Sequence, residues 1–422
     1  MKKIKKFISV LIALLLILGL TGCSKEIETV KELSEYQNIN PPIESILRVK
    51  NGKIVDENGK KTVLFGINLG NWLLMETWMN VIPEYTMDWG HYDTLEMLTE
   101  KFGEEKTDTL MRVYQENFIT DADIGQIEKL GFNCVRVPFW YRNFMHEDGS
   151  WLTENTDDNP GFQILDWLIE ACGKHGIYVI LDMHGAPGGQ SMNHSTGKAG
   201  RNLLYTDESC MQAAEKLWTA IADRYKDSPV VAAYDLLNEP QNNGGYYEGK
   251  NAWAAESEDA VKHTNAAYDR LYKAVRSVDE NHMISFEGIW STSVLPNPKK
   301  YGYENMLYQL HLYDTEQGMI RYRVDELKKI RRKWDTAVLV GEFNNFEQEA
   351  FATAKYARND ISYVKWTYKT MNTGSGWGIF NADTGHIDLN YASYEEILEF
   401  FETKLSTKNY TFNKTEMHFI LP

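Results

Sequence analysis

The chain has 422 residues, enough for two or three ordinary domains or for one large barrel. Its contents of 43% hydrophobic and 25% charged residues are close to the globular average, which excludes a disordered, collagen-like or coiled-coil protein. Because 44 lysines and arginines face 60 aspartates and glutamates, the net charge is −16 and nucleic acid is not an expected partner.

Residues 1–22 have the pattern of a secretory signal peptide. Lysines in the first six residues precede the apolar segment Phe7–Leu20, which is too short for a lasting membrane span. The sequence Leu20-Thr21-Gly22-Cys23 resembles the lipobox of bacterial lipoproteins, which implies that Cys23 is lipidated and anchors the chain to the cell membrane. An ordinary cleaved signal with a chance cysteine would instead release the protein. Both alternatives place it outside the cytoplasm.

The rest of the chain divides into a tether, a large domain and a tail. Residues 23–48 are polar, contain Pro41-Pro42 and show no periodicity, so we expect a lipid-anchored tether. Residues 49–405 form the expected domain, and residues 406–422 form a tail with a β-rich stretch, Tyr410–Leu421. Cys134, Cys172 and Cys210 are odd in number and widely spaced, which favours buried thiols over disulfides or a zinc site.

Eight short β-rich apolar runs alternate with segments of helical periodicity, which is the pattern of parallel βα units. The expected strands are Thr62–Leu69, Cys134–Pro138, Tyr178–Met183, Val231–Leu237, Met283–Phe286, Leu307–Leu312, Val338–Gly341 and Ser362–Trp366. The expected helices include Asp123–Leu130, Gln163–His175, Ala213–Tyr225, Ala260–Val278 and Tyr322–Lys333. Eight such units predict an α/β fold of the (β/α)8 TIM barrel type. A doubly wound open sheet would need a glycine-rich phosphate turn after its first strand, and Asn68–Trp72 is not one.

Polar or aromatic residues follow six of the eight expected strands. In a TIM barrel the carboxyl ends of the strands meet on one active-site face. The six strand ends are Arg136–Pro138, Asp182–Gly185, Asn238–Pro240, His311–Tyr313, Gly341–Phe343 and Trp366–Tyr368. One charged residue at a strand end is ordinarily a solvated cap or a loop ion pair, whereas six such ends on one rim indicate a functional site.

Two carboxylates on this rim, Glu239 and Glu342, have the residue type that glycosidic cleavage requires. That reaction needs one protonated carboxyl group to assist the leaving oxygen and one ionised group to attack. If Arg136 and Tyr313 lie beside Glu342, they favour its charged form, while Glu239 facing that anion keeps its proton longer. We therefore predict Glu239 as acid/base and Glu342 as nucleophile.

From about Asn51 to Phe400 the sequence resembles glycoside hydrolase family 5. Asn238-Glu239-Pro240 matches the family's strand-four motif, Glu342 its nucleophile, and Arg136 its strand-two arginine. The matching substrate-binding positions are His184, His311, Tyr313 and Trp366. This resemblance implies a retaining glycosidase in which Asn238 grips the sugar 2-hydroxyl, with no metal or cofactor.

Two segments further resemble the exo-β-1,3-glucanase branch of that family, Gly66–Glu76 and Asp182–Gln190. The resemblance places Glu76 where that branch binds the terminal glucose. Ser191–Gly197 departs from the fungal pattern, and related branches cut β-1,6- or β-1,4-linked glucans, so the linkage stays open. Within the family, an endo-β-1,4-glucanase, a mannanase or a xylanase is an alternative. The long acidic insertion at residues 81–107 is a candidate lid that would enforce exo action.

A surface lipoprotein that only binds oligosaccharide is the non-enzymatic alternative. Such a protein needs aromatic platforms, but it does not need both glutamates together with Arg136, Tyr313 and Asn238. We therefore predict a monomeric enzyme acting on β-glucan. A metal-dependent barrel hydrolase would place clustered histidines after the first strand, and the sequence has none there. Four tryptophans are assigned equally to sugar contact or to packing: Trp72, Trp78, Trp290 and Trp377.

Overall fold

The computed structural model describes residues 40–242, 257–371, 376–382 and 385–413. The predicted signal peptide, Cys23 and most of the predicted tether lie outside these residues, as do the last nine positions of the tail, 414–422. In the part of the chain that is described, no helix combines the length and apolar character needed to cross a membrane.

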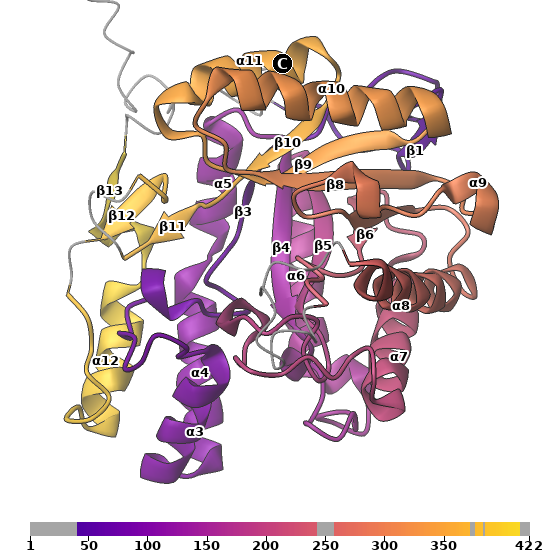
Figure 1. Cartoon of the computed structure of the whole chain (residues 1–422). Coiled ribbons are helices and arrows are strands. Elements are labelled where there is room, and N and C mark those ends of the chain that lie inside the picture. Colours follow the sequence, from indigo (N-terminus) through magenta and orange to yellow (C-terminus); the bar gives the residue numbers. More distant parts are fainter. Residues whose placement is uncertain (1–39, 243–256, 372–375, 383–384, 414–422) are drawn as a thin grey trace, which may run out of the picture. The chain divides into compact units, whose positions relative to one another are not determined.

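Eight parallel strands close into a barrel (Figure 1). They are β3 (Phe65–Asn68), β4 (Cys134–Trp140), β5 (Tyr178–Gly185), β6 (Val231–Asp235), β7 (Met283–Glu287), β8 (Met306–Leu312), β9 (Ala337–Phe343) and β10 (Ser362–Lys365). Each strand pairs with its neighbour in the chain, and β10 pairs with β3 to complete the ring. The TIM barrel predicted from the alternating pattern is confirmed, and every expected strand overlaps an observed one.

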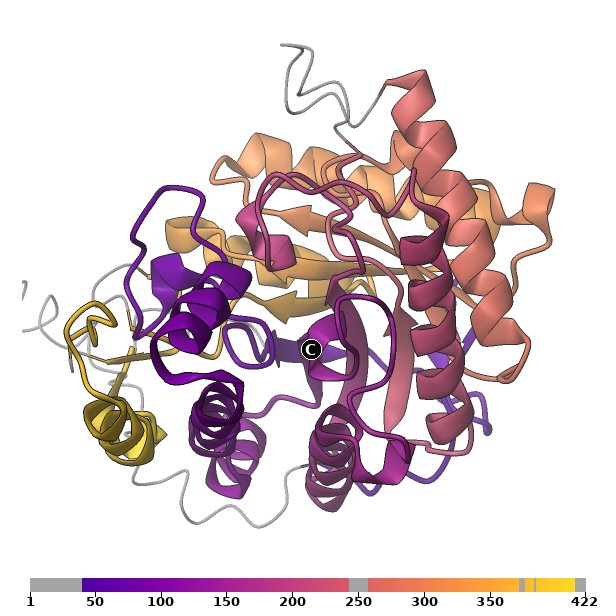
Figure 2. The same cartoon turned by 90° about the horizontal axis from the view of Figure 1, so that it is seen from below.

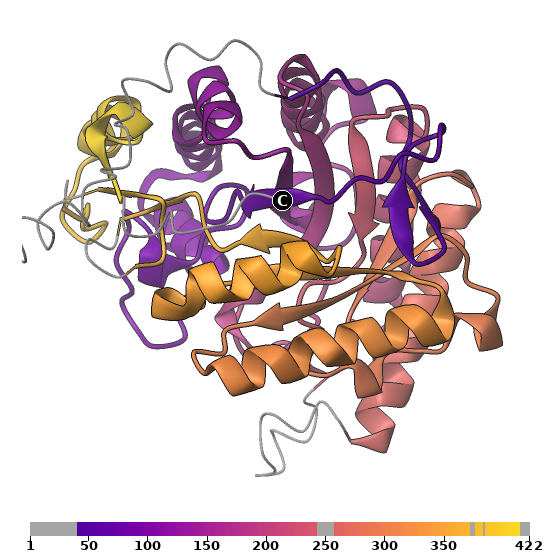
Figure 3. The same cartoon turned by 90° about the horizontal axis from the view of Figure 1, so that it is seen from above.

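Helices surround the barrel. The outer layer contains α4 (Glu104–Phe118), α5 (Asp121–Lys129), α6 (Pro160–Lys174), α7 (Glu208–Tyr225), α8 (Glu258–Arg276), α10 (Gln317–Trp334), α11 (Glu349–Arg358) and α12 (Tyr394–Lys404). Helices α10 and α11 lie side by side over β8–β10, and α7 lies beside α8 (Figures 2 and 3). Local sequence sets their starts: Asn159 caps α6 ahead of Pro160, and Ser393 forms a capping box with Glu396 on α12. The five expected helices are present, whereas α4, α11 and α12 were not among the helices named from the sequence.

The floor of the barrel is an apolar cluster built from the first residues of the strands, with Cys134, Met283 and Leu307 among its members. A hairpin of β1 (Arg48–Lys50) and β2 (Lys53–Val55) contributes to this floor, because Leu47 and Ile54 are buried in the same cluster. The side chain of Asn40 already donates to the carbonyl oxygens of Phe132 and His175, at 2.8 and 3.3 Å. Among the described residues, contacts with the barrel therefore already occur at Asn40, before the domain boundary expected at residue 49.

The residues after β10 form a second small sheet outside the barrel. It contains β11 (Lys369–Thr370), β12 (Phe380–Ala382) and β13 (Tyr410–Phe412). Strand β13 is the described part of the β-rich tail and pairs antiparallel with β12. The buried Lys369 ammonium donates to the Leu405 carbonyl at 2.8 Å and the Thr407 hydroxyl at 3.0 Å, which attaches the tail to the barrel.

The insertion at residues 81–107 combines buried residues, such as Ile82 and Leu98, with many exposed ones. It contains α3 (His91–Phe102), whose first turn lies against the loop that follows β5. The Tyr92 N–H donates to the Gly197 carbonyl at 2.8 Å, and Asp93 pairs with Lys198 at 2.7 Å. Asp93 of this insertion thus supports a neighbouring loop.

Candidate active site

A cavity of about 270 Å³ lies at the carboxyl ends of the strands. It is lined by Glu76, Trp78, His184, Asn193, His194, Ser195, Asn238, Glu239, Tyr313, Glu342, Trp366 and Trp377. Seven of the site residues predicted from the sequence are in this lining. The other two, Arg136 and His311, are fully buried and contact residues of the lining. The structure therefore brings all nine together.

Glu342, near the end of β9, is held by the two residues expected beside it. Arg136 Nη1 donates to Glu342 Oε1 at 2.9 Å, and the Tyr313 hydroxyl donates to Oε2 at 2.6 Å. Arg136 also pairs with Asp235 at 2.8 Å and Asp182 at 3.1 Å. Burial raises the pKa of Glu342, and the positive charge of Arg136 opposes that rise. Direct contact with a guanidinium and a phenol favours the carboxylate form.

Glu239 follows β6 and has no such cation in direct contact. Its backbone is in the left-handed region with a φ of 39°. His311 Nδ1 lies 2.9 Å from its Oε1. Burial raises the pKa of Glu239 to about 7, against the lowering effect of the nearby His184 charge. Of the two glutamates, Glu239 is therefore the one suited to carry a proton near neutral pH.

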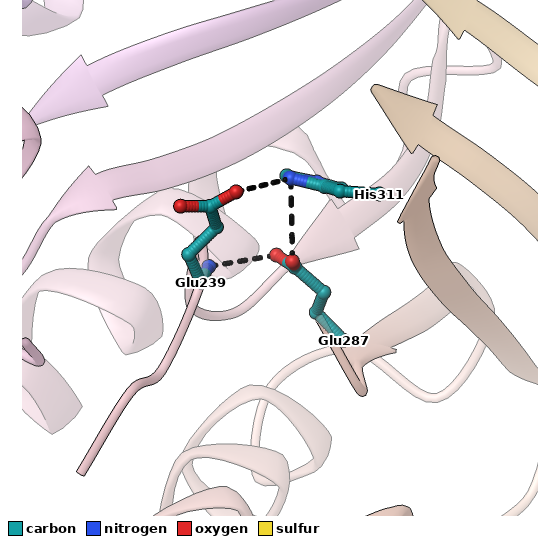
Figure 4. Close-up of side chains that lie close together, drawn as sticks. All are labelled: Glu239, Glu287 and His311. Atoms are coloured by element: carbon teal, nitrogen blue, oxygen red, sulfur yellow. Dashed lines mark hydrogen bonds and ion pairs between the residues drawn. The ribbon is translucent and has the colours of Figure 1, made fainter. Parts of the chain in front are cut away.

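A third glutamate, Glu287, lies beside this pair and was not predicted. It ends β7, is 1% exposed, and accepts a hydrogen bond from the Glu239 N–H at 2.7 Å through Oε2 (Figure 4). Its Oε1 lies 3.3 Å from His311 Nδ1. Burial and the neighbouring Glu239 charge raise the pKa of Glu287 well above its usual range, while burial lowers the pKa of His311 to about 3. A neutral imidazole therefore stands between carboxyl groups.

The separation of Glu239 and Glu342 is limited by their shared neighbour. His311 Nδ1 lies 2.9 Å from Glu239 Oε1 and 3.3 Å from Glu342 Oε2. These two oxygens are therefore at most about 6.2 Å apart, which is below the roughly 6.5–9.5 Å of inverting glycosidases and compatible with the roughly 5–5.5 Å of retaining ones. The strand pairing of β8 shifts register between Leu310 and His311, and such irregularities re-aim side chains beside active sites.

Asn238 and His184 form the side of the cavity next to Arg136. Asn238 Oδ1 accepts from Arg136 Nη2 at 2.8 Å, which leaves its amide group beside His184 Nε2 at 3.3 Å. Asp182 orients the histidine through a 2.7 Å contact with Nδ1. Burial lowers the pKa of His184, but the charge and hydrogen bond of Asp182 outweigh it and raise the pKa to about 10. The Trp366 ring stacks on this imidazole at 5.5 Å between centroids and 12° between planes.

The loop after β3 supplies Glu76 and is shaped by asparagines. Asn71, at a φ of 67°, accepts from the Glu76 N–H at 3.2 Å and from Asn80 Nδ2 at 2.6 Å. Glu76 Oε2 accepts from Trp78 Nε1 at 2.8 Å, and its Oε1 lies 3.8 Å from His184 Nε2. Only a glycine fits at position 70, where a Cβ would lie 2.8 Å from the Trp366 ring.

A polar layer beneath the cavity was also missed by the sequence analysis. Gln309 donates to Asp235 at 2.5 Å and to Ser285 at 2.8 Å, so three strands are joined below the reacting groups. Gly341 makes room for this layer, because a Cβ there would lie 1.7 Å from Gln309 Oε1. Polar residues inside apolar runs are the signal that could have identified Asp235 and Gln309.

The charge balance requires several acids of the site to hold protons. Six carboxyl groups surround two cations, Arg136 and His184, and an unpaired buried carboxylate is costly. The six are Glu76, Asp182, Asp235, Glu239, Glu287 and Glu342. Besides Glu239 and Glu287, Asp235 is a candidate, since burial raises its pKa to about 6.

The four tryptophans whose roles the sequence left undecided divide into two groups. Trp72 is fully buried and donates to the Gln115 carbonyl at 2.9 Å, so it packs the protein interior. Trp78 and Trp377 line the cavity, with ring centroids 5.3 Å apart. Trp290 lies 6.4 Å from the ring of Tyr313. Three of the four are thus placed in or beside the site.

Among the described residues, one group has the donor types and spacing that could hold a metal ion. One ligand atom each from Glu239, Glu287 and His311 lies within 4.8 Å of the others. The direct contacts of His311 with the two glutamates account for this spacing.

Comparisons with known proteins agree with this geometry. The family model described as "Cellulase (glycosyl hydrolase family 5)" matches residues 97–382. A protein named "Beta-xylosidase" from Phanerodontia chrysosporium is 33% identical over 368 residues, covering 77% of this chain and 71% of the relative. A "Probable glucan 1,3-beta-glucosidase A" from Aspergillus fumigatus is 29% identical over 311 residues, covering 70% and 68%.

Solved structures share the fold at low sequence identity. An endogalactoceramidase superposes with a TM-score of 0.60 at 16% identity, covering 85% of each chain. A rutinosidase from Aspergillus niger gives a TM-score of 0.59 at 17% identity, covering 81% of this chain and 97% of the other. At this identity the likeness extends to the barrel alone.

Proposed function

Because the chain belongs to glycosyl hydrolase family 5 and is therefore a glycoside hydrolase, we propose that it removes terminal glucose from β-glucan with retention of configuration. Glu342 is the nucleophile and Glu239 the acid/base. One observation carries this assignment: Arg136 and Tyr313 hydrogen-bond the two oxygens of Glu342, whereas Glu239 is partly buried without a cation in contact and its pKa is raised to about 7.

In the first step, the Glu342 carboxylate attacks the anomeric carbon while the glycosidic C–O bond breaks. The leaving oxygen takes the proton of Glu239, so the products are a covalent glycosyl ester on Glu342 and a Glu239 carboxylate. In the second step Glu239 removes a proton from water, whose oxygen displaces Glu342 from the sugar. Both residues return to their starting protonation states, and no external proton is consumed.

The remaining residues bind the sugar and stabilise the transition state. The Asn238 amide, oriented by Arg136, is placed to bind the 2-hydroxyl, a contact that strengthens in the transition state. Trp366 offers a flat face to the sugar ring. Burial raises the pKa of Glu76, but its interactions with His184 and Trp78 outweigh that effect and leave the pKa lowered, so Glu76 is a charged acceptor for sugar hydroxyl groups.

The shape of the site supports exo action. The cavity is smaller than the roughly 300–1,000 Å³ of ordinary ligand pockets, which favours one terminal sugar over a long chain. Its far side is closed by Trp78 and by the loop carrying Asn193 and His194, which α3 supports through Lys198. Relatives named as glucan 1,3-beta-glucosidases favour a β-1,3-linked substrate. The relative named as a β-xylosidase makes xylosides the second candidate.

The test is a time course of products from residues 24–422 on laminarin, pustulan, carboxymethylcellulose, mannan and xylan, with an aryl glucoside and an aryl xyloside. Glucose as the sole early product from laminarin or pustulan is the expected result. A ladder of oligosaccharides from carboxymethylcellulose or mannan would replace the exo proposal with an endo-acting one. Preferential cleavage of xylan and the aryl xyloside would favour the second candidate.

The pH profile gives an independent prediction for the acid. Since Glu239 must be protonated in the first step, kcat/KM for a phenyl glucoside is expected to fall about tenfold per pH unit above an apparent pKa of about 7. A 2,4-dinitrophenyl glucoside needs little protonation of its leaving group, so its profile should stay flatter over the same range. A basic limb above pH 9 for the phenyl glucoside would contradict the assignment.

We also propose that the protein is anchored outside the cytoplasm by a lipid on Cys23, as the N-terminal sequence indicates. Incorporation of labelled palmitate into the wild-type chain but not into Cys23→Ala would support the anchor. Equal recovery of both chains in the medium would refute it.

A further inference from the structure

The peptide bond that joins Asn238 to Glu239 is held at both ends by buried side chains. Gln190 Nε2 donates to the Asn238 carbonyl at 2.8 Å, and the Glu239 N–H donates to Glu287 Oε2 at 2.7 Å. Glu239 has a φ of 39°, a conformation that a residue with a Cβ keeps only when its surroundings enforce it. The hydrogen bond that the Glu239 N–H donates to Glu287 is part of that enforcement.

Glu287 also reaches the side chain of Glu239 through an intermediate. Its Oε1 lies 3.3 Å from His311 Nδ1, and the same nitrogen lies 2.9 Å from Glu239 Oε1 (Figure 4). One side chain therefore contacts both the backbone of Glu239 and the ring that orients its carboxyl group.

Glu287 is itself rigidly placed. Its backbone N–H donates to the Tyr268 hydroxyl at 2.9 Å, and that hydroxyl donates to the Glu287 carbonyl at 3.1 Å. Among the described residues it borders a small neighbouring cavity of about 40 Å³, and it is not part of the lining of the substrate cavity. Glu287 is thus placed to act on Glu239 without touching the sugar.

From these contacts we propose that Glu287 is a positioning residue that holds Glu239 in the orientation needed to protonate the leaving oxygen. This inference rests on the proposed role of Glu239 as the acid/base. The residue acts as a fixed acceptor at the end of β7, and removing the acceptor frees both the Glu239 peptide and His311. A misoriented Glu239 carboxyl group slows only the step in which the leaving oxygen is protonated, so the loss of activity should depend on the leaving group.

This dependence on the leaving group can be measured in variants of Glu287. Replacing Glu287 by Met keeps most of the volume and removes the acceptor, and an apolar residue of similar size in place of a buried ionisable group is often tolerated. We expect kcat/KM for a phenyl glucoside to fall about 100-fold in Glu287→Met, at the low end of general-acid contributions. For a 2,4-dinitrophenyl glucoside, which departs with little protonation, the loss should stay below about fivefold. Glu287→Gln restores an acceptor oxygen and should recover most of the activity on the phenyl glucoside.

Two controls separate this role from general damage. Asp279 is another buried carboxyl group, in the segment that precedes β7, where it contacts Tyr234 and His282, and Asp279→Leu should lower stability without any leaving-group dependence. Glu239→Ala should show the strongest leaving-group dependence of all. If Glu287→Met slows both glucosides equally, the positioning role is wrong. If Glu239→Ala itself shows no dependence, the proposed acid/base fails, and the inference fails with it.

If Glu287→Met does not fold, Glu287→Gln decides between the two outcomes. With thermal unfolding close to that of the wild type, a Gln variant that retains activity on the phenyl glucoside supports the acceptor role. A Gln variant that loses activity on both glucosides to the same extent contradicts it.

Discussion

Replacing Glu342 by alanine is expected to lower kcat by at least about 10,000-fold while the chain stays folded, because the covalent intermediate can no longer form. The loss should be equal for good and poor leaving groups, since the nucleophile serves both. The measurement is kcat on phenyl and 2,4-dinitrophenyl glucosides, with circular dichroism to establish folding. Glu347→Ala, an exposed glutamate shortly after β9, is the matched control and should leave kcat unchanged.

Azide provides a stereochemical check on the same variant. In Glu342→Ala a small anion has room to attack from the vacated side, and the product should be the α-glucosyl azide, with the configuration inverted. In Glu239→Ala azide attacks the glycosyl ester on Glu342 and should give the β-glucosyl azide. The opposite pairing of variants and products would exchange the roles of the two glutamates.

Replacing Arg136 by methionine is expected to reduce the free energy of unfolding by about 3–5 kcal/mol, because buried acids lose their common cation. The guanidinium pairs with Asp182, Asp235 and Glu342 at 2.8–3.1 Å, and it is fully buried. Urea unfolding followed by tryptophan fluorescence measures the loss.

The partly exposed Arg224 provides the comparison for the loss of stability in Arg136→Met. Arg224 pairs with Asp157 and Asp166 in the outer helical layer, where solvent screens the charges, and Arg224→Met should cost no more than about 1 kcal/mol. Equal losses in the two variants would show that burial of Arg136 adds nothing. The Arg136→Met deficit should also shrink as pH falls, since the acids then take up protons in the folded state.

The positions of the barrel strands could be predicted because parallel strands covered on both faces have near-continuous apolar runs. The ends of the strands were harder to predict, and the end of the fifth strand affected the predicted site. The fifth strand was expected to stop at Phe286, one residue before Glu287, so the carboxyl group that contacts Glu239 was left outside the predicted rim. Hydrophobicity marks where a strand runs, but it does not separate its last inward-facing polar residue from the loop that follows.

The residues predicted at the site were those that follow strands in recognisable motifs, such as Asn238-Glu239-Pro240. The residues that were missed act by supporting these motifs. Gln190 lies in a long loop and holds the Asn238 carbonyl through a distance of 48 residues in the chain, and Gln309 lies within an apolar strand. No local pattern reveals such contacts, because they exist only once distant strands have been brought together.

The start of the domain was also hard to predict, because it depends on contacts between residues that are distant in the chain. Asn40 and Leu47 belong to a stretch without periodicity, and their roles depend on partners far along the chain. The insertion at residues 81–107 was interpreted as a candidate lid because it is long and acidic, yet Asp93 finds its partner in Lys198 on another loop. Charge alone does not distinguish a solvated segment from one that braces a neighbour.

The closure of β3 onto β10 has a consequence for how the protein is made. The Leu64 N–H donates to the Ser362 hydroxyl at 3.0 Å across 298 residues of chain. The first barrel strand therefore cannot complete its pairing until the last one has been translated. Until then a nascent chain exposes an open strand edge, which is a template for aggregation, and folding by such distant contacts is slow. A chain cut short before Ser362 would therefore depend on chaperones to stay soluble, even though it already contains both reacting glutamates.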